Sequence, residues 1–445
     1  MSLSARERST IDLDRYSDYL NGRQRRARIS HAIFLAILVV AVAALATLLY
    51  TVINDSFGLT AVVNETDPEV VIEEAGYDPA TVTFTDLSRV QLVDVLAGGI
   101  TRNVGRRLER EQRFFEDRLV FEGPAEWDAI CAAEEPPTGC NAPARDRGSI
   151  IALVEERLVQ PTVVATYDLV PSLLEREAIV AEIAANHPDA RVEFRSWLSA
   201  GFVTKPQSAN PQVAGVRTAL LGSLWVIGVT IVFSVPVGIG AAIYLEEFAP
   251  RNRISRFIQT NINNLAGVPS IIYGMLGLAV LVRGLGPIMS GDSGSGRTVL
   301  AAGLTLGLLI LPIIIIASQE AIRAVPNSLR QAGLALGATR WQTVRSHILP
   351  AAFPGVMTGT ILAVARAVGE TAPLIVVGAS TFITTDPTSI FSKFTALPIQ
   401  IYQWTSRPQD EFRNIAAAAI LVLLVLLLTL NGAAVILRNR YSRKA

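Results

Sequence analysis

Histidine and cysteine are scarce in this sequence, which contains three histidines and two cysteines among its 445 residues. The histidines, His31, His187 and His347, lie far apart, and none has the spacing of a metal-ligand set or of a catalytic triad. The sequence therefore lacks the sets of residues that a hydrolase or a metalloenzyme needs. We expect no catalytic residue, no metal site and no cofactor bound by this chain.

A usable nucleotide-binding loop is missing as well. The segment GDSGSGRT, from Gly291 to Thr298, has the glycine spacing of a phosphate-binding loop, but Arg297 stands where that motif requires lysine. Such a loop follows a buried strand and opens a helix, whereas this segment joins two long apolar runs. We interpret it as a flexible Gly/Ser turn, so ATP must be bound by another polypeptide if it is used.

The two cysteines, Cys131 and Cys140, lie in the segment CAAEEPPTGC. In an oxidising compartment, this pair would close a small loop rich in proline and glycine. We predict a disulfide between them. The alternative is two free thiols in a reducing cytosol.

The net charge of zero results from two regions of opposite sign. Residues 54–211 contain 27 acidic and 14 basic side chains, whereas the rest of the chain contains 12 acidic and 25 basic. Basic residues beside apolar runs are typical of membrane topology, because short Lys/Arg-rich loops stay in the cytoplasm. Nucleic acid is therefore not an expected partner. For residues 54–211, the acidic balance favours solubility over a dedicated docking face.

Apolar runs long enough to cross a bilayer occur six times. The first, 32–53, follows a polar cytoplasmic segment, 1–31, and is too long for the core of a signal peptide, so we predict a retained transmembrane helix. With an inner N-terminus, the basic loops and the basic tail 438–445 all fall in the cytoplasm. The five further predicted spans are about 218–245, 262–282, 299–317, 353–379 and 415–437.

Residues 54–211 contain no run long enough to span, and we predict a soluble extracytoplasmic α+β domain there. A helix is expected at 103–121 and another in SLLEREAIVAEIAANH. Strand-like segments begin at four positions: Thr81 (TVTF), Ser149 (SIIALV), Val163 (VVATYDLV) and Arg191 (RVEFRSWL).

The predicted cytoplasmic loop 318–352 contains the sequence QAGLALGATRWQTVRSHILP. Its glycines and its final Leu-Pro predict two short helices that are joined at a glycine bend and stopped by proline. The spacing resembles the EAA loop of ABC importer permeases, which runs Glu-Ala-Ala, three residues, Gly, nine residues, Ile, one residue, Leu-Pro. Four positions match this pattern: Ala332, Gly337, Leu349 and Pro350. Three positions differ from its Glu, second Ala and Ile: Gln331, Gly333 and His347.

The flanking segments EAIRAVPNSLR and ARAVGETAP resemble the phosphate-importer permease of the Pst type, over about Val216 to Leu437. This resemblance implies an α-helical integral membrane protein with six transmembrane helices, and a permease domain of the type I ABC importer fold at 216–437. In that family the loop docks into a separate ATPase subunit, which uses the ATP. The residues thereby assigned to ATPase coupling are Gln331, Ala332, Gly333, Gly337, Leu349 and Pro350.

An ionisable pair lies inside the fifth predicted span, in AVARAVGETAPL, where Arg366 and Glu370 share one helical face. An ionisable side chain in hydrocarbon costs about 2.5–3.5 kcal/mol on insertion scales, so a structural or functional role must offset the cost of this pair. It is either a structural ion pair or part of a polar path, in which Arg366 binds phosphate oxygens and Glu370 restrains it. We favour the second interpretation, with Thr371 beside the pair.

The sequence thus predicts a permease subunit of an ATP-driven importer of inorganic phosphate in the bacterial inner membrane. The implied partners are a second homologous permease subunit, two ATPase subunits, an extracytoplasmic phosphate-binding protein and membrane lipid. One alternative is a permease for sulfate, molybdate or phosphonate. Another is a phosphate-responsive membrane sensor whose 54–211 domain binds a ligand.

Overall fold

The chain forms two compact units, Met1–Asn54 and Asp55–Ala445. The predicted helix at 103–121 and the predicted disulfide partners Cys131 and Cys140 lie outside the described residues. The predicted Gly/Ser turn lies partly outside them. The computed structural model describes residues 11–88, 91–92, 95–96, 150–151, 154–159, 161–290, 296–379, 382–383 and 385–442.

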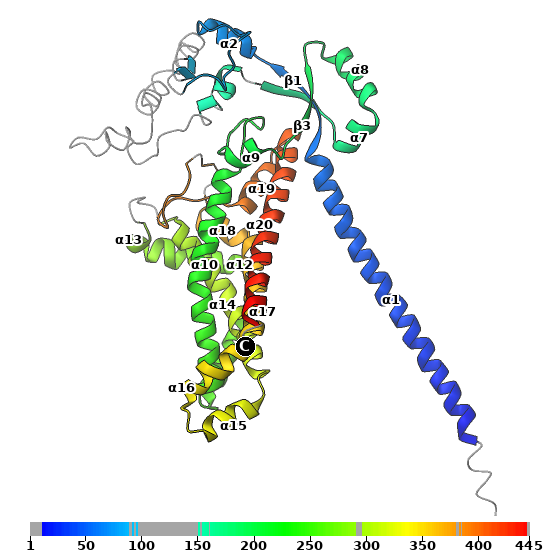
Figure 1. The fold of residues 1–445 in the computed structure, drawn as a ribbon, viewed down its shortest axis with the longest axis vertical. Coiled ribbons are helices and arrows are strands. Elements are labelled where there is room, and N and C mark those ends of the chain that lie inside the picture. The colour runs from blue at the N-terminus through cyan, green and yellow to red at the C-terminus, as the bar shows by residue number, and fades with distance from the viewer. Residues whose placement is uncertain are drawn as a thin grey trace, which may run out of the picture. The chain divides into compact units, whose positions relative to one another are not determined.

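The first unit is one long helix, α1 (Ile11–Asp55), coloured blue in Figure 1. Its part Ala27–Asp55 has a mean hydropathy of 3.0 and is long enough to cross a membrane. The apolar side chains of this part are largely exposed, as expected for a helix that lipid or another helix covers. The predicted boundary at residue 31 is not a helix end, because α1 runs through it.

The second unit begins with a three-stranded antiparallel sheet in the order β2-β1-β3. Its strands are β1 (Phe57–Asn64), β2 (Pro161–Thr166) and β3 (Arg191–Ser196). The strands predicted from Val163 and Arg191 are confirmed, whereas those predicted from Thr81 and Ser149 are wrong. Short apolar runs of this kind fit a strand or a buried helix equally well, and here both pack into one apolar cluster.

The central strand, β1, is not predicted from the sequence. It lies between its two neighbours with Leu59 opposite Phe194 of β3 and Ala61 opposite Ala165 of β2. Glycine is required at position 58, because a Cβ there would lie 1.8 Å from the carbonyl oxygen of Tyr167. The short helices around the sheet are α2 (Pro68–Glu74), η1 (Glu155–Val159), α7 (Leu169–Leu174) and α8 (Arg176–Asn186).

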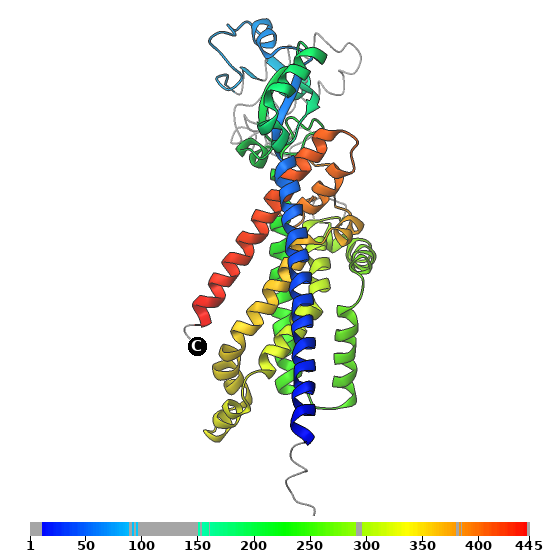
Figure 2. The same cartoon turned by 90° about the vertical axis from the view of Figure 1, so that its right-hand side faces the viewer.

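A helical bundle follows the sheet in the second unit (Figures 1 and 2). Together with the first unit, the described residues contain five helices long and apolar enough to cross a membrane, or six if a bent pair counts as one span. The long bundle helices are α10 (Arg217–Ile243) with its π-helical extension η2 (Tyr244–Phe248), α14 (Val299–Arg323), α17 (Leu349–Gly369) and α20 (Asp410–Ser442).

Two of the predicted spans are broken helices. The predicted span 262–282 falls on α11 (Arg253–Ala266) and on α12 (Ser270–Leu276), which continues as η3 (Gly277–Gly284), and the two parts meet at 107°. Pro269 precedes α12, where its missing N–H is not needed. The shorter helices of the bundle are α13 (Gly286–Met289), α15 (Asn327–Ala335), α16 (Arg340–Thr343), α18 (Ala372–Val377) and α19 (Leu397–Thr405).

The predicted span 353–379 breaks between α17 and α18. Glu370 has an extended backbone, with φ −77° and ψ 117°, and α18 begins two residues later. Pro373 explains the break, since it has no N–H to donate to the carbonyl of Gly369. The pair Arg366 and Glu370 therefore lies at a helix end rather than within a continuous helix.

Small residues allow α14 to approach two neighbouring helices. A Cβ at Gly303 would lie 2.5 Å from a methyl carbon of Val229 on α10, and a Cβ at Gly359 of α17 would lie 2.2 Å from that of Ala317 on α14. Close approach of backbones is the usual means of helix association in lipid. These glycines therefore pack helices within this chain.

Gly359→Ala should lower the melting temperature of the purified protein, because overpacking a tight helix contact costs about 1–3 kcal/mol. The matched control is Gly228→Ala on α10, where a Cβ would meet nothing within 4 Å. Thermal unfolding of both variants in the same detergent checks the prediction. An equal loss of stability in the two variants would show that the α14–α17 contact is not tight.

Candidate functional site

The segment predicted to couple to an ATPase, Gln331 to Pro350, falls on α15, on α16 and on the helical turns that lead into α17. The helices α15 and α16 lie at the end of the bundle opposite α9 (Ala200–Thr204) and α19 (Figure 1). The glycine bend is confirmed, since Gly337 has a φ of +81° between the two helices. The predicted stop at Pro350 is wrong. Residues Arg340–Gly369 form one continuous helix, in which the π-helical turn η5 (Val344–Ile348) precedes the proline and accommodates its missing N–H.

Ion pairs fix the coupling segment to the end of α10. The guanidinium of Arg330 contacts the carboxylate of Glu247 at 2.8 Å and also donates to the carbonyl oxygens of Val325 and Ile322. Both side chains of the Arg330–Glu247 pair are largely buried, so water screens the pair less than a surface pair. No sequence spacing predicts this contact, because its partners lie 83 positions apart.

The six residues predicted for ATPase coupling have different environments. Gly333 is buried, and a Cβ there would lie 2.7 Å from the hydroxyl oxygen of Thr343. Leu349 and Pro350 are half-buried at the start of α17. The remaining three are exposed: Gln331, Ala332 and Gly337.

Three large apolar side chains of the same segment are exposed, and the sequence analysis did not single them out. Leu334 is 50% exposed, Leu336 is 89% exposed and Trp341 is 54% exposed. The ring of Trp341 also contacts Phe248, at 6.5 Å between centroids. The segment therefore leaves three large apolar side chains uncovered.

The pair predicted to line the path is formed in the structure. Arg366 Nε lies 3.3 Å from Glu370 Oε1, and the side chains are 49% and 17% exposed respectively. Among the described residues, the guanidinium has no other hydrogen-bond partner, so most of its five N–H groups are free to bind a ligand. Thr371 is half-buried immediately before α18.

The helix break beside Arg366 is held by close packing. A Cβ at Gly274 of α12 would lie 2.7 Å from the Cα of Pro373 on α18. The broken helix pair α11–α12 therefore contacts the second broken span three residues after Glu370.

Other polar side chains are wholly or partly buried in the bundle without a signal in the sequence. The side-chain amides of Gln259 on α11 and Gln319 on α14 exchange hydrogen bonds of 3.1 and 2.8 Å. Gln400 on α19 is fully buried. In the part of the chain that the structure describes, no three His, Cys, Asp or Glu side chains come together in a group that could hold a metal ion.

The chain matches the family described as binding-protein-dependent transport system inner membrane component over residues 234–443. The probable ABC transporter permease protein YqgI of Bacillus subtilis (strain 168) is 33% identical over 249 residues, which cover 53% of this chain and 82% of that protein. This chain belongs to that permease family. It is accordingly a multi-pass inner-membrane protein, and its expected fold class, a helical ABC importer permease with an added α+β segment, is confirmed.

The permease is also similar to two phosphate transport system permease proteins. PstA 1 of Mycobacterium tuberculosis (strain CDC 1551 / Oshkosh) is 37% identical over 232 residues, covering 52% of the permease and 72% of that protein. PstA of Haemophilus influenzae is 31% identical over 235 residues, covering 53% and 79%. The expected resemblance to PstA is therefore confirmed. Among solved structures, inward-facing conformations of the MetNI methionine ABC transporter align with a TM-score of 0.41 and 20% identity, over 53% of the permease and 99% of that chain.

Proposed function

We propose that the permease imports inorganic phosphate along a path to which Arg366 contributes a guanidinium group. The observation that carries this proposal is the half-exposed Arg366 at a helix break, with only Glu370 as a partner among the described residues. A planar guanidinium forms paired hydrogen bonds with a tetrahedral oxyanion and cannot lose its charge at neutral pH. The names of the phosphate-transport relatives support phosphate as the anion.

The proposed importer contains a second homologous permease, two ATPase subunits and an extracytoplasmic phosphate-binding protein. The exposed side chains Leu334, Leu336 and Trp341 support docking of the ATPase to the coupling segment, because burying such side chains stabilises a complex. Gln331, Ala332 and Gly337 lie on the same exposed segment.

The proposed orientation puts the coupling segment in the cytoplasm and residues 54–211 outside. It is supported by the position of α15 and α16 at the bundle end opposite α9 and α19 (Figure 1). The basic residues of the loops beside α15 agree with retention in the cytoplasm.

The anion specificity can be tested with the whole importer in sealed vesicles. Phosphate, added with the binding protein, should stimulate ATP hydrolysis and accumulate inside the vesicles. Sulfate, molybdate and phosphonate are the comparison anions at equal ionic strength. Accumulation of one of these instead of phosphate would replace the proposed substrate, and the absence of any transport would overturn the importer function.

A further inference from the structure

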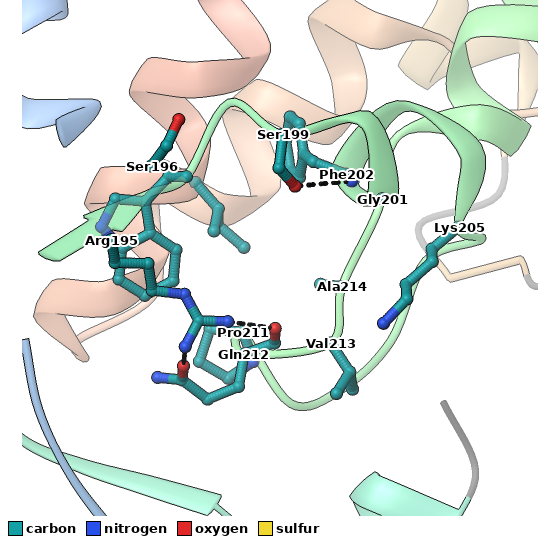
Figure 3. Close-up of a pocket in the computed structure, with 12 residues that line it drawn as sticks. Arg195, Ser196, Ser199, Gly201, Phe202, Lys205, Pro211, Gln212, Val213 and Ala214 are labelled. Carbon is teal, nitrogen blue, oxygen red and sulfur yellow. Dashed lines mark hydrogen bonds between the residues drawn. The ribbon is translucent and has the colours of Figure 1, made fainter. Parts of the chain in front are cut away.

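The chain between β3 and α10 surrounds a pocket of about 120 Å³ (Figure 3). It lies at the sheet-bearing end of the bundle, and all its lining residues except Ile415 precede those that match the permease family. Trp197 and Phe202, which line the pocket, belong to the same buried cluster as Trp404 and Phe412 of α19 and α20. A ligand in this pocket would therefore contact the packing that joins the sheet to the bundle.

Arg195, at the end of β3, extends along one side of the pocket (Figure 3). Its guanidinium stacks over the ring of Trp197 at 4.7 Å and donates to the side-chain and main-chain oxygens of Gln212. Burial lowers the pKa of Arg195, although the negative charges of Glu193 and Glu155 act in the opposite direction. Among the described residues, no carboxylate lies within ion-pair distance of this guanidinium, so its burial is not offset by a direct ion pair.

Lys205 brings a second positive charge to the opposite side of the pocket (Figure 3). Its ammonium lies 3.4 Å from the carboxylate of Glu155, and both side chains are about one-third exposed. The hydroxyl of Ser199 accepts a hydrogen bond from the backbone N–H of Phe202, and its own proton is available to a ligand. The pocket therefore has two cations, a hydroxyl donor and one carboxylate at its edge.

We propose that this junction pocket binds a small oxyanion of the phosphate class. Two of the five N–H groups of Arg195 donate to Gln212, which leaves three for a ligand, and Lys205 offers a mobile point charge across the pocket. A volume of about 120 Å³ accommodates one tetrahedral anion with a little water, because a water molecule occupies roughly 30 Å³.

The site is separate from the path at Arg366 and goes beyond the proposed import function. An anion held between Arg195 and Lys205 would link the end of β3 to the segment that leads into α10. Ligand binding to the folded state alone stabilises it by mass action. External anion would thus regulate how firmly the sheet is joined to the bundle.

The test uses the full-length permease alone in lipid nanodiscs, without ATPase or binding protein. Radiolabelled phosphate binding and the melting temperature are measured against phosphate concentration, with gluconate holding ionic strength constant. We expect saturable binding and a rising melting temperature, an affinity at least tenfold lower for Arg195→Gln, and a smaller loss for Lys205→Gln. Arg191→Gln is the matched control, because this exposed arginine of β3 pairs with Asp67 and does not line the pocket.

Two further variants make the result specific. Arg195→Lys keeps the charge but not the planar guanidinium with its several donors, and we expect an intermediate affinity. Arg366→Gln should bind phosphate as the wild type does. The proposal is overturned if the wild type does not bind phosphate, or if binding survives in both Arg195→Gln and Lys205→Gln. Loss of binding in Arg366→Gln alone would overturn it too and would assign the anion to the path, whereas uptake by the assembled importer tests the import function separately.

Discussion

Arg366→Gln should reduce phosphate uptake by the reconstituted importer about 10- to 100-fold, since a hydrogen bond to a charged group is worth about 1.5–3 kcal/mol and each 1.4 kcal/mol is tenfold. The amount of assembled complex should stay the same, because the side chain is 49% exposed and, among the described residues, it pairs with Glu370 alone. Initial rates of radiolabelled phosphate uptake into vesicles, normalised to permease content, give the measurement.

Two controls separate the role of Arg366 from the general loss of an arginine. Arg413→Gln removes an exposed arginine that forms a comparable short-range pair with Asp410 on α20, and it should not change uptake. Arg366→Lys keeps the charge without the planar donors and should restore only part of the rate. Wild-type uptake by Arg366→Gln would leave the pair with a structural role only.

Leu336→Asp should weaken binding of the ATPase by roughly a hundredfold, because burying a leucine contributes about 1.5–3 kcal/mol and a carboxylate in an apolar groove adds a further cost. Leu336 is 89% exposed, so its replacement removes almost no packing within the permease. Co-purification of the ATPase with tagged permease measures the effect, and phosphate-stimulated ATP hydrolysis should fall in parallel.

Leu174→Asp is the matched control for this experiment. Leu174 is 79% exposed on α7, beside the sheet rather than on the coupling segment, so the substitution should leave ATPase binding unchanged.

A second comparison uses Gly337, where φ is +81° and a Cβ meets nothing within 4 Å. Asn and Asp tolerate this backbone similarly, so a stronger effect of Gly337→Asp than of Gly337→Asn reports the added charge. Undiminished ATPase recovery with Leu336→Asp would remove the coupling segment from the docking surface.

Much of the membrane architecture is predictable because long apolar runs have few alternatives to spanning a bilayer. The runs that became α10, α14 and α20 show this. Breaks within a run are harder to predict, since proline is compatible with a kink, a new helix or an uninterrupted helix. Pro373 ends α17 early and Pro269 lies at a 107° bend, whereas Pro350 lies within a continuous helix.

The candidate site was predictable where its residues are close in sequence. Arg366 and Glu370 are four positions apart, and a helical turn brings them together. Contacts between distant segments leave no such signal. The pair Arg330–Glu247 and the opposed side chains Arg195 and Lys205 depend on packing between elements, and the exposure of Leu336 depends on what the fold leaves uncovered. The central strand β1 was missed because it directly follows a long helix and contains a glycine.

The uninterrupted helix from Arg340 to Gly369 has a mechanical consequence. Thirty residues at about 1.5 Å each make a helix of roughly 45 Å, with one end in the coupling segment and the other at the break before Thr371. A helix resists compression far more than a loop, so a displacement of this helix at Trp341 would also move Arg366. In the proposed importer, docking of the ATPase and binding of phosphate would thus act on the two ends of one helix, with no relay of side chains between them.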